Sequence, residues 1–217
     1  MQVTSVEPQR RKQDRLNIFL NGSYAFSLDT GTVLKNSIKK GRELSQKEIE
    51  LLLRENETAK LVDLSLNYLS YRPRSQKEIT DYLAKKIAQR ENIKFNQAKE
   101  SELIEGCLKK LTKYKYIDDL EFAKWWAESR ERSNPKGARL IKLELLRKGV
   151  DRDVIDEILG KDLNQKELAS KAIQKKLKAW KNLPSAELKN KAYRYLASRG
   201  FDYDQISETV AQLVKKR

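Results

Sequence analysis

Leu145–Ile155 reads LLRKGVDRDVI and Leu196–Ile206 reads LASRGFDYDQI, so the chain writes one phrase twice. In each copy a basic residue and a glycine follow Leu, and then come an apolar residue, Asp, a second Asp two positions on, and Ile. A cation stabilises the end of a helix, glycine enters the left-handed conformation after it, and Asp can cap the next helix. The phrase therefore predicts the end of one helix, a short turn and the start of another.

The two Asp pairs of the phrase allow a second interpretation. Asp151 with Asp153, and Asp202 with Asp204, are spaced like paired catalytic carboxylates. Each pair also lies in the first turn of a predicted helix, where negative charge meets the positive end of the helix dipole. We prefer the capping interpretation, which makes the repetition structural.

A repeated helix–turn–helix phrase predicts a repeated three-helix unit, and units this small must stack to bury their apolar faces. The first three-helix unit, at residues 60–118, is a longer and divergent copy that lacks the glycine. The sequence thus predicts a mainly α fold, a curved array of three three-helix repeats with a small N-terminal β-hairpin extension. The expected parts are the hairpin with a helix (1–59) and repeats at 60–118, with an insertion near 88–99, 119–163 and 164–217.

The N-terminal segment has strand character. Asn21 and Gly22, a pair favoured in tight hairpin turns, separate RLNIFL from SYAFSL. Val3–Val6 can add a third strand, and the sheet needs a helix to pack against because a lone hairpin is marginal. Alternation along the two main strands predicts one apolar face, made of Ile18, Leu20, Tyr24 and Phe26.

Two capping boxes mark helix starts in the rest of the chain. Ser45 is followed three residues later by Glu48, and Ser75 by Glu78, so side chain and backbone can satisfy each other at both places. Asp118 or Asp119 caps a later helix. The three Trp and nine Tyr residues are expected mainly in the core and between repeats.

Composition excludes several kinds of function. The chain has no His, one Cys (Cys107) and no glycine-rich phosphate loop, which removes His-based catalysis and thiolate or imidazole metal sites. The sequence therefore predicts a protein without enzymatic activity, cofactor or metal. A single cysteine and the lack of a long apolar segment predict a cytoplasmic protein that does not enter the membrane.

Charge points instead to an anionic partner. The formal net charge is +15, and its distribution is uneven. Residues 119–163 hold 10 basic and 10 acidic residues, whereas 164–217 hold 13 basic and 5 acidic ones. Basic faces beside a charge-balanced one suit a polyanion or a partner that is itself charge-patterned.

Three stretches carry a resemblance to a known family. Tyr116–Asp151 reads YIDDLEFAKWWAESRERSNPKGARLIKLELLRKGVD, Leu69–Lys86 reads LSYRPRSQKEITDYLAKK, and the start reads VTSVEPQRRKQDRLNIFLNGSYAFSL. Together they resemble the RecX family, regulators of the bacterial RecA recombinase. Two parts depart from the family pattern: the insertion QRENIKFNQAKESE, and the last repeat, which matches only in its capping phrase.

The resemblance implies a regulatory protein that binds the RecA–single-stranded-DNA filament and mostly inhibits its ATPase and strand exchange. It also implies weaker, non-specific contact with single-stranded DNA, and we expect a monomer. The alternative is a general basic single-stranded nucleic-acid-binding helical protein. Both hypotheses need Lys and Arg on an extended surface.

Basic residues near the repeat junctions are the candidate filament or DNA contacts. Arg72 and Arg74 precede a helix start, where free N–H groups can also bind phosphate. Arg139 lies in the family-like stretch and can alternatively pair with Glu144. A lysine-rich stretch near the C-terminus is expected to lie along one helix. The full set is Arg72, Arg74, Lys77, Arg130, Arg132, Lys136, Arg139, Lys171, Lys175, Lys176, Lys178 and Lys181.

Overall fold

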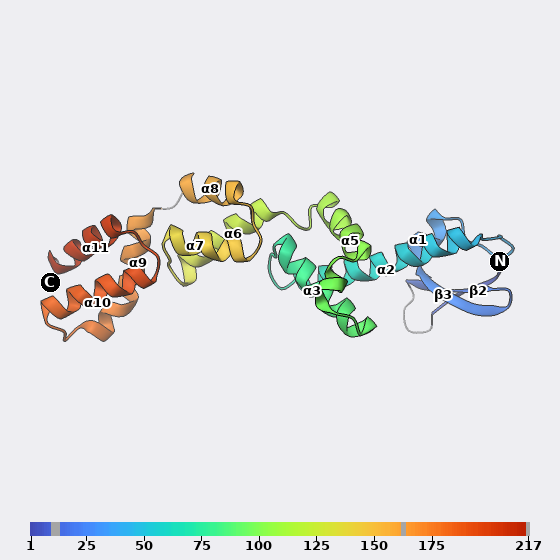
Figure 1. Cartoon of the computed structure of the whole chain (residues 1–217), viewed down its shortest axis with the longest axis horizontal. Coiled ribbons are helices and arrows are strands. Elements are labelled where there is room, and N and C mark those ends of the chain that lie inside the picture. Colours follow the sequence, from blue (N-terminus) through green and yellow to red (C-terminus); the bar gives the residue numbers. More distant parts are fainter. Residues whose placement is uncertain (10–13, 162–163, 216–217) are drawn as a thin grey trace. The chain divides into compact units, whose positions relative to one another are not determined.

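The computed structural model describes residues 1–9, 14–161 and 164–215 (Figure 1). It forms two compact units, one of Met1–Tyr71 with Thr80–Tyr116 and one of Arg72–Ile79 with Ile117–Arg217. Helices make up most of both units, which confirms the predicted mainly α fold. The boundary predicted at 163/164 adjoins residues outside the described ranges.

The first unit begins with a three-stranded antiparallel sheet. Strands β1 (Val3–Pro8), β2 (Arg15–Leu20) and β3 (Ser23–Asp29) lie in the order β1-β2-β3. Asn21 and Gly22 join β2 to β3 with φ angles of 48° and 85°, the positive values that a type I′ turn requires. The hairpin and its third strand are confirmed.

The predicted apolar face of the sheet is wrong at Tyr24. Ile18 pairs with Phe26 but Phe19 pairs with Tyr24, so Ala25 is an extra residue that bulges from β3. A bulge shifts the alternation by one residue. Phe26 is therefore buried, while Tyr24 is 58% exposed and meets the Phe19 ring edge-on, with 5.9 Å between centroids.

Helices of the first unit cover the sheet and form the first repeat. They are α1 (Thr30–Lys35), α2 (Gln46–Leu69), most of α3 (Gln76–Glu91), α4 (Phe95–Lys99) and α5 (Glu102–Lys113). The sheet packs on α1 and α2 around one apolar core. Helix α2 starts with the predicted capping box, since Glu48 accepts from Ser45 N at 2.8 Å and Ser45 Oγ accepts from Glu48 N at 3.2 Å. It continues unbroken past the predicted boundary at 59/60.

The second unit holds two three-helix groups with separate cores. The first contains α6 (Asp119–Ser133), α7 (Ala138–Arg147) and α8 (Arg152–Lys161). The second contains α9 (Gln165–Leu177), the 3₁₀ helix η1 (Lys178–Trp180), α10 (Ser185–Ser198) and α11 (Tyr203–Lys215). Asp118 caps α6 by accepting from Leu120 N and Glu121 N, as the sequence predicts.

The repeated phrase ends the second helix of each group. Gly149 and Gly200 have φ angles of 81° and 82°, and the next N–H, of Val150 or Phe201, donates back into the last helical turn. The first repeat ends its second helix in the same way with Asn92, whose φ is 54°. Asn is the commonest substitute for glycine in this left-handed position. The helix end that the repeated phrase encodes therefore occurs three times in the structure, although the phrase itself occurs twice in the sequence.

The expectation that the tyrosines lie mainly in the core is wrong for most of them. Trp180 is buried, and Trp125 and Trp126 pack partly buried against the core of their group. Exposed tyrosines project from both units, namely Tyr24, Tyr71, Tyr114, Tyr116 and Tyr203. A tyrosine is apolar enough for a core and polar enough for a surface, so composition alone does not place it.

Candidate functional site

The first junction in the second unit joins the start of α3 to the turn between α7 and α8. Ser75 Oγ donates to the Lys148 carbonyl at 2.7 Å, and the Gln76 N–H donates to Asp119 Oδ1 at 2.8 Å. A Cβ atom on Gly149 would lie 2.7 Å from the Cβ of Lys77. Glycine is thus needed at this turn for close approach as well as for its left-handed backbone.

Glu78 lies at the centre of the charges at this junction. Its carboxylate accepts from Arg72 at 2.8 and 3.1 Å and from Lys148 Nζ at 2.7 Å. Burial opposes the charge of Glu78, but the hydrogen bonds and positive charges of Arg72 and Lys148 prevail and lower its pKa to about 2. The Lys148 ammonium also lies 4.2 Å from the ring centroid of Trp126.

A second carboxylate, Glu144, contacts the indole N–H of Trp126. It accepts from Arg130 Nε at 2.7 Å, from Trp126 Nε1 at 2.9 Å, and from Lys136. Burial works against its charge, yet these donors hold the pKa of Glu144 below its usual value. The Arg130 guanidinium stacks 4.1 Å above the Trp126 ring. We call these residues the junction cluster: Arg72, Glu78, Trp126, Arg130, Lys136, Glu144 and Lys148.

The alternative pairing of Arg139 with Glu144 is wrong. Five positions on an α-helix turn the side chain about 140° away from its starting direction, so the two residues point to different sides of α7. Glu144 takes its cations from α6 and from the segment before α7. Arg139 is left exposed.

The second junction repeats the construction of the first. The Gly137 N–H donates to the Arg199 carbonyl at 2.9 Å, and the Ala138 N–H donates to Gln165 Oε1 at 3.0 Å. Gln165 and Asp119 are both the first residue of the opening helix of a group, and Ala138 and Gln76 both begin the second helix of the preceding group. Each copy of the repeated phrase thus packs against the start of the second helix of the preceding repeat.

Glycine again permits the contact at the second junction. A Cβ atom on Gly137 would lie 2.1 Å from the Gly200 carbonyl oxygen, and one on Gly200 would lie 2.6 Å from the Cβ of Leu140. Both approaches are closer than side-chain contacts allow. Asn92 ends the corresponding helix of the first repeat with its side chain exposed.

The candidate contact residues divide into internal and exposed groups. Arg72, Arg130 and Lys136 belong to the junction cluster, and Arg74 is half-buried. Lys171 pairs with Glu131 and Glu167 at 3.3 and 3.0 Å. The remaining candidates are exposed: Lys77, Arg132, Arg139, Lys175, Lys176, Lys178 and Lys181.

The expected single lysine-bearing helix near the C-terminus is wrong. Helix α9 ends at Leu177, Lys178 opens the 3₁₀ helix η1, and Lys181 follows it. Trp180, the last residue of η1, is buried, and its ring centroid lies 5.6 Å from that of Tyr195. The five candidate lysines are therefore divided between α9, η1 and the segment that follows it.

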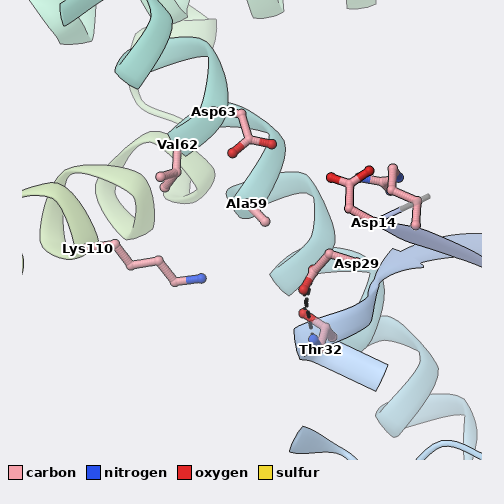
Figure 2. Close-up of a pocket in the computed structure, with 8 residues that line it drawn as sticks. Asp14, Asp29, Thr32, Ala59, Val62, Asp63 and Lys110 are labelled. Atoms are coloured by element: carbon pink, nitrogen blue, oxygen red, sulfur yellow. Dashed lines mark hydrogen bonds between the residues drawn. The ribbon is translucent and has the colours of Figure 1, made fainter. Parts of the chain in front are cut away.

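A hollow of about 350 Å³ in the first unit gathers charged side chains of both signs (Figure 2). Its lining includes Asp14, Asp63 and Lys110, which come from different parts of the chain. Asp29 at its edge accepts from Thr32 N at 2.8 Å and Thr32 Oγ1 at 2.7 Å, and so serves as the N-cap of α1. Within the described ranges, no group of three or more carboxylate, thiol or imidazole side chains is arranged to hold a metal ion.

The family models that match this chain correspond to an N-terminal domain and three three-helix domains. Family models match at residues 1–45 (regulatory protein RecX N-terminal domain), 63–91, 118–159 and 164–210 (the first, second and third three-helix domains of RecX). Among the described residues, no helix has the length and apolar character needed to cross a membrane.

Relatives and solved structures agree with these matches. The regulatory protein RecX of Bacillus subtilis is 35% identical over 213 residues, which cover 97% of this chain and 76% of that protein. RecX of Listeria welshimeri is 33% identical over 93% of this chain and 71% of its own. A crystal structure of regulatory protein RecX superposes with a TM-score of 0.72 at 27% identity, covering 100% of this chain and 99% of that one. RecX from Lactobacillus salivarius gives 0.58 at 25% identity, over 75% of this chain and 99% of its own. With its N-terminal sheet, its three three-helix domains and relatives of this identity along nearly its whole length, the chain belongs to the RecX family of regulatory proteins.

Proposed function

We propose that this protein binds the RecA–single-stranded-DNA filament and lowers its ATP hydrolysis and strand exchange, with no catalysis of its own. The observation that carries the proposal is membership of the RecX family, with family-model matches to the N-terminal domain and to each of the three three-helix domains. We also propose that it acts in the cytoplasm and as a monomer.

The distribution of cations supports a charged partner. Two shielded carboxylates of the second unit, Glu78 and Glu144, are each paired with two cations of the junction cluster. Arg132 and Arg139 remain exposed on the same group, and the last group adds the exposed Lys175, Lys176 and Lys178. We propose the exposed cations as the contacts and the junction cluster as their support.

A general single-stranded nucleic-acid-binding protein is the second candidate. The observation in its favour is the excess of 13 basic over 5 acidic residues in 164–217, which suits phosphate contact without a protein partner. The charge-balanced middle repeat argues against it, because a protein that only contacts phosphates gains from positive charge throughout.

The decisive experiment titrates the purified protein into RecA on single-stranded DNA and follows ATP hydrolysis and strand exchange. A filament regulator should inhibit when it is substoichiometric to RecA, because a few molecules can block the growth of a long filament. A competitor for phosphates should inhibit only when it covers the DNA, and should displace an unrelated single-strand-binding protein equally well. Inhibition only at DNA-saturating amounts would refute the proposed function.

Salt dependence provides a second test. Binding to naked single strands should weaken with salt, with a log–log slope of about −0.7 for each phosphate contacted. Binding to the filament should retain a component that is less sensitive to salt, from protein–protein contact. Equal slopes for both would favour the general nucleic-acid binder.

A further inference from the structure

A shallow hollow of about 410 Å³ lies where α7, α10 and α11 meet in the second unit. Its lining includes Arg139 from α7, Tyr193 and Arg194 from α10, and Phe201, Asp202 and Tyr203 at the turn into α11. The second junction builds it, because the close contact of Gly200 with Leu140 brings the start of α7 against the last cap phrase.

The base of this hollow is apolar and its rim is cationic and aromatic. Phe201 and Ile206 are 3% and 4% exposed, so they form a fixed floor. Arg139 and Arg194 are exposed, and neither guanidinium has an ion-pair partner within the part of the chain that the structure describes. Two unpaired guanidinium groups beside an apolar floor favour an anionic ligand that carries a flat apolar group.

The two tyrosines that line the hollow favour a ligand with a single flat ring system. Tyr203 is 72% exposed, and its ring lies 6.3 Å from that of Tyr193 at an angle of 45° between their planes. Rings tilted in this way cannot sandwich a flat group between them, but the open face of Tyr203 can stack against one. A nucleobase stacked on an aromatic side chain beside cations is the usual arrangement for single strands.

We propose that this hollow binds one unstacked nucleotide of single-stranded DNA, with the base against Tyr203 and the flanking phosphates at Arg139 and Arg194. The identification of the strand as the DNA of the filament rests on the proposed function, whereas binding of the nucleotide does not. This proposal makes Arg139 a DNA contact and distinguishes it from candidate cations that contact protein.

Asp202 at the rim adds a preference among bases. Its carboxylate repels phosphate, which directs the backbone of the strand toward the two arginines. It can also accept a hydrogen bond from the exocyclic amino group of cytosine or adenine, which thymine lacks. We therefore expect oligodeoxycytidine to bind more tightly than oligodeoxythymidine, and Asp202→Ala to remove the difference.

The test measures fluorescence anisotropy of a labelled oligodeoxycytidine with the full chain, in the absence of RecA. Tyr203→Ala should weaken binding by about tenfold or more, the loss that one stacked base commonly gives, and Tyr203→Phe should restore most of it. Tyr71→Ala is the matched control, since Tyr71 is 84% exposed and lies outside the hollow. Arg139→Ala should likewise weaken binding several-fold more than Arg132→Ala.

Three outcomes would overturn the proposal. The first is equal binding by the Tyr203→Ala and Tyr71→Ala variants, with circular dichroism showing both folded. The second is equal loss from Arg139→Ala and Arg132→Ala. The third is a Tyr203→Ala variant that binds the oligonucleotide as tightly as the wild type but no longer binds the filament. That result would mean that the hollow holds an acidic peptide instead. Inhibition of RecA by the wild-type chain is measured separately, so failure of the hollow and failure of the proposed function are distinguishable.

Discussion

Replacing Glu78 with Gln tests whether the junction cluster holds the start of α3 in the second unit. The amide keeps the size of the side chain and some of its hydrogen bonds, but it removes the negative charge. Arg72 and Lys148 then face each other with no counter-charge, and their side chains are only 28% and 19% exposed. Stranded, shielded cations are more costly than a lost surface pair.

The size of the effect follows from the pKa of Glu78. Lowering that pKa from 4.5 to about 2 corresponds to about 3 kcal/mol of favourable interaction with the ionised form. The Glu78 side chain is 17% exposed, so solvent screens little of this energy. Because the folded-state pKa lies below the unfolded one, the stabilisation is present above about pH 4.5 and disappears as the pH falls toward 2.

The assay is urea unfolding followed by tryptophan fluorescence, since Trp125 and Trp126 lie beside Arg72 in the folded protein. At pH 7 we expect Glu78→Gln to lower the free energy of unfolding by about 2–3 kcal/mol. Glu121→Gln is the control, because Glu121 forms an exposed pair with Lys124 on α6 and should cost less than about 1 kcal/mol.

The difference between wild type and variant should shrink as the pH is lowered through the window from 4.5 to 2. Other carboxylates titrate in both proteins, so the difference between the two curves isolates Glu78. A variant as stable as wild type at pH 7, or a difference that does not change with pH, would refute the reasoning about the cluster.

Urea midpoints also test the three helix ends. Gly137→Ala should cost about 2 kcal/mol or more, because its Cβ would collide with the Gly200 carbonyl while its own φ of −70° suits any residue; a neutral result would mean that the junction is looser than described. Gly200→Ala should cost more than Gly41→Ala, since both have positive φ but only Gly200 also faces a neighbouring side chain; equal losses would contradict the close approach. Asn92→Gly should be neutral or raise stability by up to about 1 kcal/mol, because glycine adopts a φ of 54° more readily; a clear loss would show that the Asn side chain has another role.

Helix ends and turns were predictable because their causes are local. The capping box at Ser45, the turn at Asn21-Gly22 and the left-handed Gly149 and Gly200 each depend on atoms within about one turn of chain. The repeated phrase could thus reveal the three-helix unit before any tertiary contact was known. Its third occurrence stayed hidden because Asn92 stands where the other two copies have glycine.

Pairing among charged side chains was not predictable, because it joins residues far apart in the chain. Lys148 reaches Glu78 across 70 positions, and Arg72 and Arg130, expected as free contacts, are instead held by internal carboxylates. Sequence spacing alone suggested Glu144 for Arg139.

The hollow at Arg139 also required the tertiary structure, since it needs α7 and α11 to meet through two glycines. The sequence carried the backbone geometry of this protein, because capping and left-handed turns are settled by neighbouring atoms. Packing between repeats decided which cations are neutralised by internal carboxylates and which stay exposed, because ion pairs form between charges that the fold brings close in space.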